Sequence, residues 1–381
     1  MLTPKLCQMA LSMLEGLNPT RKKQLLEAVG NCPEKLFQKD LPDLDETLVS
    51  PALKALLADR SLLERADREL EFAQDHQIRI SWFLDDDYPK RLKECPDGPL
   101  LVYRRGDADL DARRTLAVVG TRRMTAYGKQ QTEEILQGLA QVCPDILVVS
   151  GLAYGVDSCA HREALRNHLP TVGVLAHGMD RIYPTAHRQL AMEMLENGGG
   201  LLSEMPSGTE PFPMRFVQRN RIIAGLSDAC LVVESADKGG SLLTAGMAQS
   251  YNREVMAIPG RLSDPVSKGC NQLIHKHVAS MITSPEDILK LMDWDLPEQI
   301  RQGELFSGNP SYDLERLTPA VRELVGWFED GRDYSVDELC TKYRQQGTDP
   351  SMGWLMSNLL QLEMDHVLQS LPGNRYRLDK V

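Results

Sequence analysis

The stretch LAVVGTRRMTAYG, from Leu116 to Gly128, determines the fold class that we expect for this chain of 381 residues. Its apolar run does not alternate with polar residues, which is typical of a strand buried on both faces of a parallel sheet. A polar turn begins at Gly120, and after it Ile135, Leu136 and Leu139 recur on one face of a predicted helix. A strand, a turn and a helix in this order predict the opening of a Rossmann-like unit.

The turn of this unit carries Arg122 and Arg123 and is suited to binding an anion. Backbone N–H groups at a helix N-terminus attract phosphate, and arginine side chains strengthen that attraction. Gly120 and Gly128 are too far apart for the dinucleotide fingerprint G-x-G-x-x-G, so a nicotinamide cofactor is not expected. The alternative is that Gly120 only permits a tight turn and that the arginines are solvated.

Five further apolar runs alternate with helical windows, at residues 146–150, 171–176, 200–204, 229–234 and 253–259. This alternation predicts an α/β fold with an extended Rossmann-like, doubly wound parallel sheet. Short apolar runs from Ile78 onward, interrupted by prolines, indicate an additional strand that feeds the sheet. We expect this domain to span residues 81–294.

Two smaller domains are predicted to flank the sheet domain. Residues 1–80 predict helices around a G-L-N-P turn, which fits a helix-hairpin-helix or SAM-like unit or, alternatively, a packing or protein-contact module. After a linker at 295–312, residues 313–381 predict three helices and a β-wing, the pattern of a winged helix. Its predicted recognition helix, residues 350–364, is poor in basic residues, which favours a protein contact over major-groove reading.

The composition argues against several classes of protein. No window approaches the roughly 18 uninterrupted apolar residues of a membrane helix, and no signal peptide is recognisable, so we expect a cytoplasmic chain without membrane contact. The eight cysteines are scattered without a C-x-x-C pair, which favours free thiols over zinc or disulfides. The net charge of -11 argues against indiscriminate coating of nucleic acid. Residues 113–129 and 212–223, however, contain basic side chains and no acid, which permits a local basic groove.

The candidate site lies where the predicted strands end, because sheets of this kind bind ligands outside the carboxyl ends of their strands. One apolar run ends in Ser150-Gly151. Another is followed by a glycine-rich helix start that contains Gly240, Ser241 and Thr244. Glycines at a helix N-terminus leave backbone amides open to an anion, so both turns are predicted to contribute to the site.

The segment 212–221 supplies further residues of the candidate site. Arg215 and Arg219 are four residues apart and share one face of a helix, and Phe216 beside them offers a ring on which a base can stack. Surface packing is the alternative for arginines that lie beside an aromatic residue.

The sequence predicts neither a catalytic group nor a metal site. His161 follows Asp157 by one helical turn, which predicts a helix-capping carboxylate paired with the imidazole rather than a hydrolytic triad. No G-x-S-x-G or H-E-x-x-H motif is present. The acids at 85–87 indicate a turn or helix cap, since adjacent acids point in different directions and no histidine lies at ligand spacing.

Several colinear motifs together resemble one bacterial family, the DNA-processing protein A (DprA or Smf) family. The motifs are YP at 88–89, PLLVY at 99–103, VVGTR at 118–122, SGLAYGVDSCAHREAL at 150–165, GMDRIYP at 178–184, LLSEMP at 201–206, FPMRFVQRNRIIAGLS at 212–227, GGSLLTA at 239–245 and AIPG at 257–260. Their shared order makes the resemblance far more specific than any single motif.

The resemblance implies a non-catalytic protein without a cofactor that binds single-stranded DNA in a basic pocket and forms homodimers. It also implies that the protein protects incoming DNA and delivers it to the RecA recombinase during natural transformation. By analogy, the pocket would be lined by Arg122, Ser150, Gly151, Arg219, Asn220, Arg221, Gly240, Ser241 and Thr244. Phe216 or Tyr154 would serve as the stacking platform.

Two departures from the family pattern affect the detail of this pocket. The family commonly has Ser-Gly-Ser where this chain has Gly239-Gly240-Ser241, and Gly-Ala where it has His277-Val278-Ala279. Neither departure removes an arginine from the predicted pocket.

Three other functions are compatible with parts of the sequence. An enzyme that cleaves nucleoside monophosphates would have a similar glycine-rich helix start, but it needs a catalytic glutamate that residues 242–252 lack. A nicotinamide-dependent dehydrogenase would need the missing glycine fingerprint. A pure scaffold protein is the third alternative, because the DNA affinity is inferred.

Overall fold

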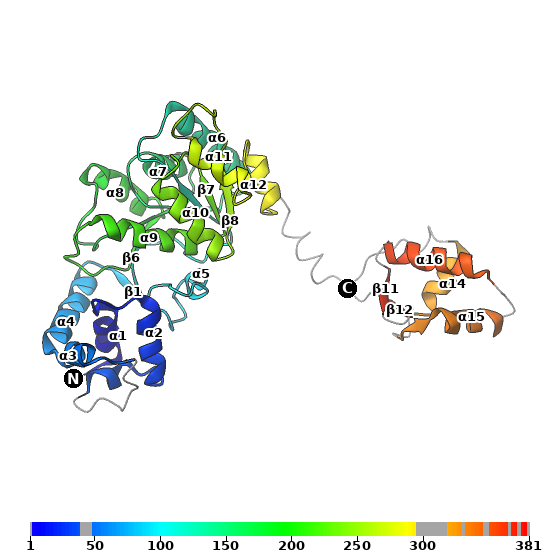
Figure 1. Cartoon of the computed structure of the whole chain (residues 1–381), viewed down its shortest axis with the longest axis horizontal. Helices are drawn as coiled ribbons and strands as arrows, with labels where there is room; N and C mark the ends of the chain where they lie inside the picture. The colour runs from blue at the N-terminus through cyan, green and yellow to red at the C-terminus, as the bar shows by residue number, and fades with distance from the viewer. Residues whose placement is uncertain are drawn as a thin grey trace. The chain divides into compact units, whose positions relative to one another are not determined.

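The computed structural model describes residues 2–38, 48–294, 318–328, 332–345, 350–364, 367–371 and 375–378. The chain divides into two compact units, one within residues 1–295 and the other within 296–381 (Figure 1). The linker predicted at 295–312 lies outside the described residues. The boundary predicted near residue 80 falls inside the first unit, where the N-terminal helices pack against the sheet.

One sheet organises the first unit. Its nine described strands are β1 (Arg79–Trp82), β2 (Leu101–Gly106), β3 (Thr115–Val119), β4 (Leu147–Ser150), β5 (Thr171–Val174), β6 (Gly200–Ser203), β7 (Ala229–Val232), β8 (Glu254–Ala257) and β9 (Ser280–Met281). They lie in the order β1-β2-β6-β5-β4-β3-β7-β8-β9. Strands β3 to β9 pair in parallel, whereas β1 and β2 form an antiparallel extension beside β6. The predicted doubly wound sheet is confirmed, and two strands, β1 and β2, extend it where one additional strand was predicted.

Helices connect the strands and cover both faces of the sheet (Figure 1). They are α5 (Lys90–Lys93), α6 (Ala126–Val142), α7 (Val156–Arg166), α8 (Arg188–Glu196), α9 (Pro213–Gly225), α10 (Gly240–Ser250), α11 (Lys268–His275) and α12 (Pro285–Leu291), with the 3₁₀ turn η2 (Thr185–His187) before α8.

The sheet divides the core into two layers, because successive side chains of a strand point to opposite faces. In β3, Leu116 and Val118 lie in the buried cluster that contains Ile135 of α6. Ala117 and Val119 lie in the cluster on the other face, where α9 and α10 pack. Every residue of β3 is buried, which explains why its sequence shows no polar alternation.

The strand order reverses beside β3. The chain passes from β3 to β4, β5 and β6 on one side, and β7, β8 and β9 lie on the other side. The carboxyl ends of β3 and β7 therefore border the crevice in which sheets of this kind bind their ligands.

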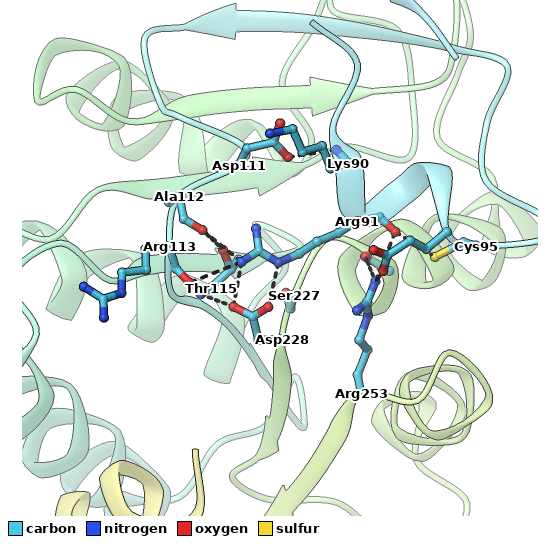
Figure 2. Close-up of polar contacts among 12 residues, drawn as sticks. Lys90, Arg91, Cys95, Asp111, Ala112, Arg113, Thr115, Ser227, Asp228 and Arg253 are labelled. Carbon is cyan, nitrogen blue, oxygen red and sulfur yellow. Dashed lines mark hydrogen bonds and ion pairs between the residues drawn. The ribbon is translucent and has the colours of Figure 1, made fainter. Parts of the chain in front are cut away.

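At the opposite end of the sheet, one carboxylate joins the segments that precede β3 and β7 (Figure 2). Arg91 donates from Nε to Asp228 Oδ1 at 2.7 Å and from Nη2 to Asp228 Oδ2 at 2.8 Å. The backbone N–H of Thr115 donates to the same Oδ2 at 2.8 Å, and Arg91 also donates to the carbonyl oxygen of Ala112 at 2.9 Å. This bidentate pair fixes the α5 segment at the end of the sheet away from the crevice.

The N-terminal region contains α1 (Pro4–Met13), α2 (Pro19–Ala28), the 3₁₀ helix η1 (Pro33–Phe37), α3 (Pro51–Ala58) and α4 (Arg60–Asp75). Gly16 adopts a φ of 78° in the turn between α1 and α2, a conformation that favours glycine. The Asn18 side chain caps α2 by accepting the N–H of Arg21 at 2.8 Å. These interactions form the helical hairpin predicted around the G-L-N-P turn.

The N-terminal helices contact the sheet domain at two places. Their apolar side chains form a buried cluster with Trp82 of β1 and Tyr103 of β2. The buried carboxylate of Glu69, in α4, accepts the backbone N–H of Ser207 at 2.9 Å and also its hydroxyl at 2.5 Å. This contact anchors the loop that leads into α9.

The second unit contains α14 (Pro319–Gly326), α15 (Val336–Gln345), α16 (Met352–Met364) and an antiparallel sheet in the order β10 (Tyr334–Ser335), β12 (Arg375–Leu378), β11 (Leu368–Leu371). Three helices and a small sheet are the elements predicted there, and the winged-helix assignment remains a prediction. Within the described parts of both units, no helix combines the length and the apolar character needed to cross a bilayer.

Candidate functional site

A cavity of about 440 Å³ lies outside the carboxyl ends of β3 and β7. Its wall is formed by the turn after β3, the turn before α7 with the start of α7, the loop before α8, α9 with the loop before it, and the segment from the end of β7 to the start of α10. Segments that are far apart in the sequence therefore meet at the point where the strand order reverses.

The turn after β3 is fixed by close backbone contacts. A Cβ atom on Gly120 would lie 2.5 Å from the side chain of Val156, so only glycine fits between β3 and α7. The N–H of Thr121 donates to the carbonyl oxygen of Glu234 at 2.8 Å, which ties the turn to the end of β7. Arg122 follows on the cavity wall with an exposed side chain, while the exposed Arg123 lies outside the wall.

The Glu234 carboxylate holds the start of α6 rather than a ligand. It is buried and accepts the backbone N–H of Thr125 at 2.9 Å and the Thr125 hydroxyl at 2.5 Å. A Cβ atom on Gly128 would lie 2.4 Å from this carboxylate. The wide spacing from Gly120 to Gly128 thus has a structural cause, because the second glycine makes room for Glu234 instead of contacting a pyrophosphate.

Arg219 of α9 is the buried cation of the site. Its guanidinium donates to the carbonyl oxygen of Gly151 at 2.7 Å and also to that of Val174, at the ends of β4 and β5. Burial lowers the pKa of Arg219 to about 10; the carboxylate of Asp157 opposes this shift, and the Arg122 cation adds to it. The guanidinium therefore stays charged at neutral pH.

Asp157 is a buried acidic residue of the same wall. Burial raises the pKa of the Asp157 carboxyl, and the positive charge of Arg219 is the strongest influence that acts in the opposite direction. Hydrogen bonds from the backbone N–H groups of Ala153 and Gly151 act in the same direction as Arg219. Asp157 and Arg219 thus favour each other's charged forms.

Phe216 contacts two arginines and a tyrosine on the cavity wall. The guanidinium carbon of Arg122 is 5.2 Å from the centre of the Phe216 ring, and that of Arg219 is 5.9 Å away. The ring of Tyr183 also contacts Phe216, with 5.7 Å between the ring centres. Cation–π contacts of this length stabilise both the ring and the exposed Arg122.

The start of α10 forms the remaining wall. The first turn of a helix leaves backbone N–H groups without helical partners and carries partial positive charge. Ser241 Oγ donates to Ser235 Oγ at 2.8 Å, and a Cβ atom on Gly239 would lie 2.2 Å from that same Ser235 Oγ. A side chain at position 239, where the family commonly has serine, would therefore require the Ser235 hydroxyl to move.

The structure brings most of the predicted site residues together. Those on the cavity wall are Arg122, Phe216, Arg219, Asn220, Gly240, Ser241 and Thr244. Gly151 lies directly behind the wall, where its carbonyl oxygen holds Arg219.

Four predicted residues are directed to other partners. Ser150 is buried and donates to the carbonyl oxygen of Val118 at 2.6 Å. Arg215 donates to the carbonyl oxygen of Glu210 at 2.5 Å, and Arg221 forms an ion pair with Glu204. The fourth, the predicted stacking residue Tyr154, packs its ring on His187 instead, with 4.9 Å between the ring centres. These four side chains lie outside the cavity wall.

The predicted pairing of His161 with Asp157 is wrong. The fully buried imidazole contacts Thr171 Oγ1 through Nδ1 at 2.7 Å, and the same hydroxyl donates to the carbonyl oxygen of Val148 at 2.9 Å. Burial, with nearby cationic groups, lowers the pKa of His161 to about 3. His161 is thus a neutral core residue that bonds to Thr171 rather than to Asp157.

The acids at 85–87 belong to a turn, as predicted. Asp85 accepts the backbone N–H of Trp82 at 2.9 Å, and Asp87 accepts the hydroxyl of Ser81 at 2.8 Å and an N–H of Arg104 at 2.6 Å. Within the described ranges, no group of three or more potential ligand side chains is arranged to hold a metal ion.

Comparison with known proteins places this geometry in a family. Residues 79–293 match the sequence model of the family described as DNA recombination-mediator protein A. The chain belongs to this family. The match covers the whole sheet and every element that forms the cavity wall.

Members of the family are similar to the chain over most of its length. The DNA processing protein DprA of Streptococcus pneumoniae is 35% identical over 274 residues, which cover 72% of this chain and 93% of that protein. Protein Smf of Escherichia coli (strain K12) is 39% identical over 297 residues, which cover 76% and 75% respectively.

Two solved structures of family members have the same fold. The crystal structure of DNA processing protein A from Streptococcus pneumoniae matches with a TM-score of 0.59 and 31% identity, over 76% of this chain and 98% of that one. A structure of DNA processing protein A from Helicobacter pylori, described for its single-stranded DNA binding mode, matches with a TM-score of 0.52 and 32% identity. That match covers 58% of this chain and 98% of the other.

Arg219→Leu is expected to destabilise the first unit by about 3 kcal/mol, because it leaves two carbonyl oxygens unpaired and the Asp157 charge buried without its counter-charge. Urea unfolding followed by circular dichroism measures the loss. Arg215→Leu is the matched control on the same helix, since that side chain donates to one carbonyl oxygen, and its cost should be below about 1 kcal/mol. Equal losses for both variants would contradict the structural role of Arg219.

His161 predicts a pH dependence of stability. Its folded-state pKa of about 3 lies below the value of 6.5 expected for an unfolded chain, so the unfolded state binds the extra proton as the pH falls between these values. The contribution of neutral His161 to the free energy of unfolding is fully present above the unfolded-state pKa. As the pH falls from about 7 to about 5, protonation of His161 in the unfolded state should lower the free energy of unfolding by about 2 kcal/mol. The difference between wild type and His161→Asn in urea unfolding at the two pH values isolates this effect; an equal pH dependence in both proteins would refute it.

Proposed function

We propose that this chain binds single-stranded DNA in the cavity outside β3 and β7. The observation that carries the proposal is Arg122, an exposed cation on the cavity wall that forms no ion pair with any described residue. A cation already paired with a carboxylate is neutralised within the protein, whereas Arg122 remains open to a phosphate. The N-terminus of α10, on the same wall, offers a second positive feature.

The aromatic side chains beside Arg122 favour a single strand over a duplex. Phe216 and Tyr183 share the wall with the cation, so a phosphate and an unstacked base meet complementary groups within one cavity. Bases of a duplex are stacked and paired, whereas those of a single strand can turn onto an aromatic ring. The Helicobacter pylori relative, described for its single-stranded DNA binding mode, supports this choice of ligand.

The wall also favours binding without catalysis. Among the described wall residues, Asp157 supplies the only carboxylate, and it is 8% exposed. A general base needs access to the proton that it removes, and burial restricts the access of a substrate to Asp157. Glu234 is occupied by Thr125 at the start of α6.

On this proposal the bound strand is protected and passed to the RecA recombinase by a cytoplasmic homodimer, during DNA recombination and natural transformation. The support for this step is the family to which the chain belongs, whose description is that of a recombination mediator, and the DNA-processing relatives within it. The second unit, with α16 poor in basic residues, is proposed to contact protein rather than a DNA groove.

Arg122→Ala is expected to weaken binding of a labelled dT strand by about tenfold, because one charge-assisted phosphate contact is lost. The slope of log Kd against log salt should fall by about 0.7, since fewer counterions are released. Fluorescence anisotropy across a salt series measures both quantities.

Arg123→Ala is the matched control for this experiment. Arg123 is the next residue, and its side chain is exposed but lies outside the wall. The substitution removes the same charge and should change Kd by less than about threefold. Equal effects of the two substitutions, or binding that is indifferent to salt, would contradict the proposed site. Release of free base from a nucleoside monophosphate by the purified protein would favour an enzyme instead.

A further inference from the structure

Tyr183 lies on the cavity wall, although none of the sequence arguments for the site included it. It comes from the loop between β5 and η2, whereas the other aromatic residue of the wall, Phe216, comes from α9. The two rings are tilted at 53° to each other, with 5.7 Å between their centres. Tyr183 remains 46% exposed, so a large part of its ring surface faces neither Phe216 nor the core.

The backbone of Tyr183 is held by a buried histidine. His177 Nδ1 lies 2.8 Å from the carbonyl oxygen of Gly178, which makes Nδ1 the protonated nitrogen. His177 Nε2 is then the acceptor for the backbone N–H of Tyr183 at 3.2 Å. Pro184, the next residue, is buried. The ring is thus presented from a fixed backbone, which reduces the entropy that binding would remove.

Phe216 contacts both Tyr183 and the cation of the wall. Arg122 lies 5.2 Å from the Phe216 ring centre, and the ring centre of Tyr183 lies 5.7 Å from it. Two guanidinium groups already lie over Phe216, whereas no cation–π contact involves Tyr183 among the described residues. Arg122 and Tyr183, both in contact with Phe216, therefore offer one cavity a phosphate site and an open aromatic surface.

We propose that Tyr183 is the residue on which an unstacked base of the bound strand stacks. This assignment rests on the proposed function and specifies it: the cavity recognises a base as well as a phosphate. Stacking on an aromatic ring accepts every base, so Tyr183 contributes affinity for single strands without sequence preference.

Tyr154 provides the contrast that makes the assignment testable. It is 51% exposed and lies in the turn before α7, but its ring packs on His187 and is not on the cavity wall. Two tyrosines of similar exposure near the same edge of the sheet thus differ in whether they face the cavity. The Tyr183 hydroxyl has no hydrogen-bond partner among the described residues, so Tyr183→Phe keeps the ring and removes no such bond.

The test compares wild type, Tyr183→Ala, Tyr183→Phe and Tyr154→Ala on two labelled strands of equal length, one of dT and one in which every base is replaced by an abasic site. We expect Tyr183→Ala to weaken binding of the dT strand by about 5- to 100-fold and to change binding of the abasic strand by less than about twofold. Tyr183→Phe and Tyr154→Ala should bind the dT strand within about twofold of wild type.

Three results would overturn the assignment. Tyr183→Ala with unchanged affinity for dT would exclude a base contact. Equal weakening on both strands would indicate that Tyr183 only shapes the wall. Weakened binding of dT by Tyr183→Phe would indicate that the hydroxyl, and not the ring, makes the contact. Failure of the proposed function gives a different result. Wild type itself would then not bind dT, or Arg122→Ala would bind dT with the same affinity as wild type.

Discussion

The buried guanidinium of Arg219 is the constraint on which the site depends. It joins α9 to the carboxyl ends of β4 and β5 through the carbonyl oxygens of Gly151 and Val174. Burying a charge is costly unless it is paired and hydrogen-bonded, and here the two carbonyls and the Asp157 carboxylate offset that cost. With α9 fixed in this way, Phe216 lies on the cavity wall in contact with Arg122 and Tyr183. The buried Arg219 thus fixes the helix that carries Phe216, and Phe216 contacts the exposed Arg122.

Much of the fold was predictable from the sequence because the strands are buried on both faces. β3 is apolar after Thr115, and the same pattern located β4 to β8 to within a few residues, whereas the two-residue strand β9 was not predicted. The location of the cavity was predictable because the strand order reverses beside β3 and sheets of this kind bind ligands at that point. The binding role of each wall residue stays a prediction.

The direction of individual side chains was harder to predict. Arg219 and Arg221 are two residues apart and therefore point about 200° apart around a helix, so both could not face one cavity; Arg221 pairs with Glu204 instead. The spacing of Asp157 and His161 predicted a contact within one helix, but the His161 imidazole is hydrogen-bonded to the hydroxyl of Thr171 in β5. Tyr183 was missed because only long-range packing brings its loop beside α9. Local spacing carries no information about such partners.

Hydrogen–deuterium exchange of the full chain, measured by mass spectrometry with and without a dT oligonucleotide, tests most directly whether the strand occupies this cavity. We expect slower exchange of backbone amides in the turn after β3, the loop that carries Tyr183, and the first turns of α9 and α10. Amides around Arg91 and Asp228, at the opposite end of the sheet, should exchange at the same rate in both samples. Protection confined to the N-terminal helices or to the second unit, with the cavity peptides unchanged, would contradict the assignment of the site.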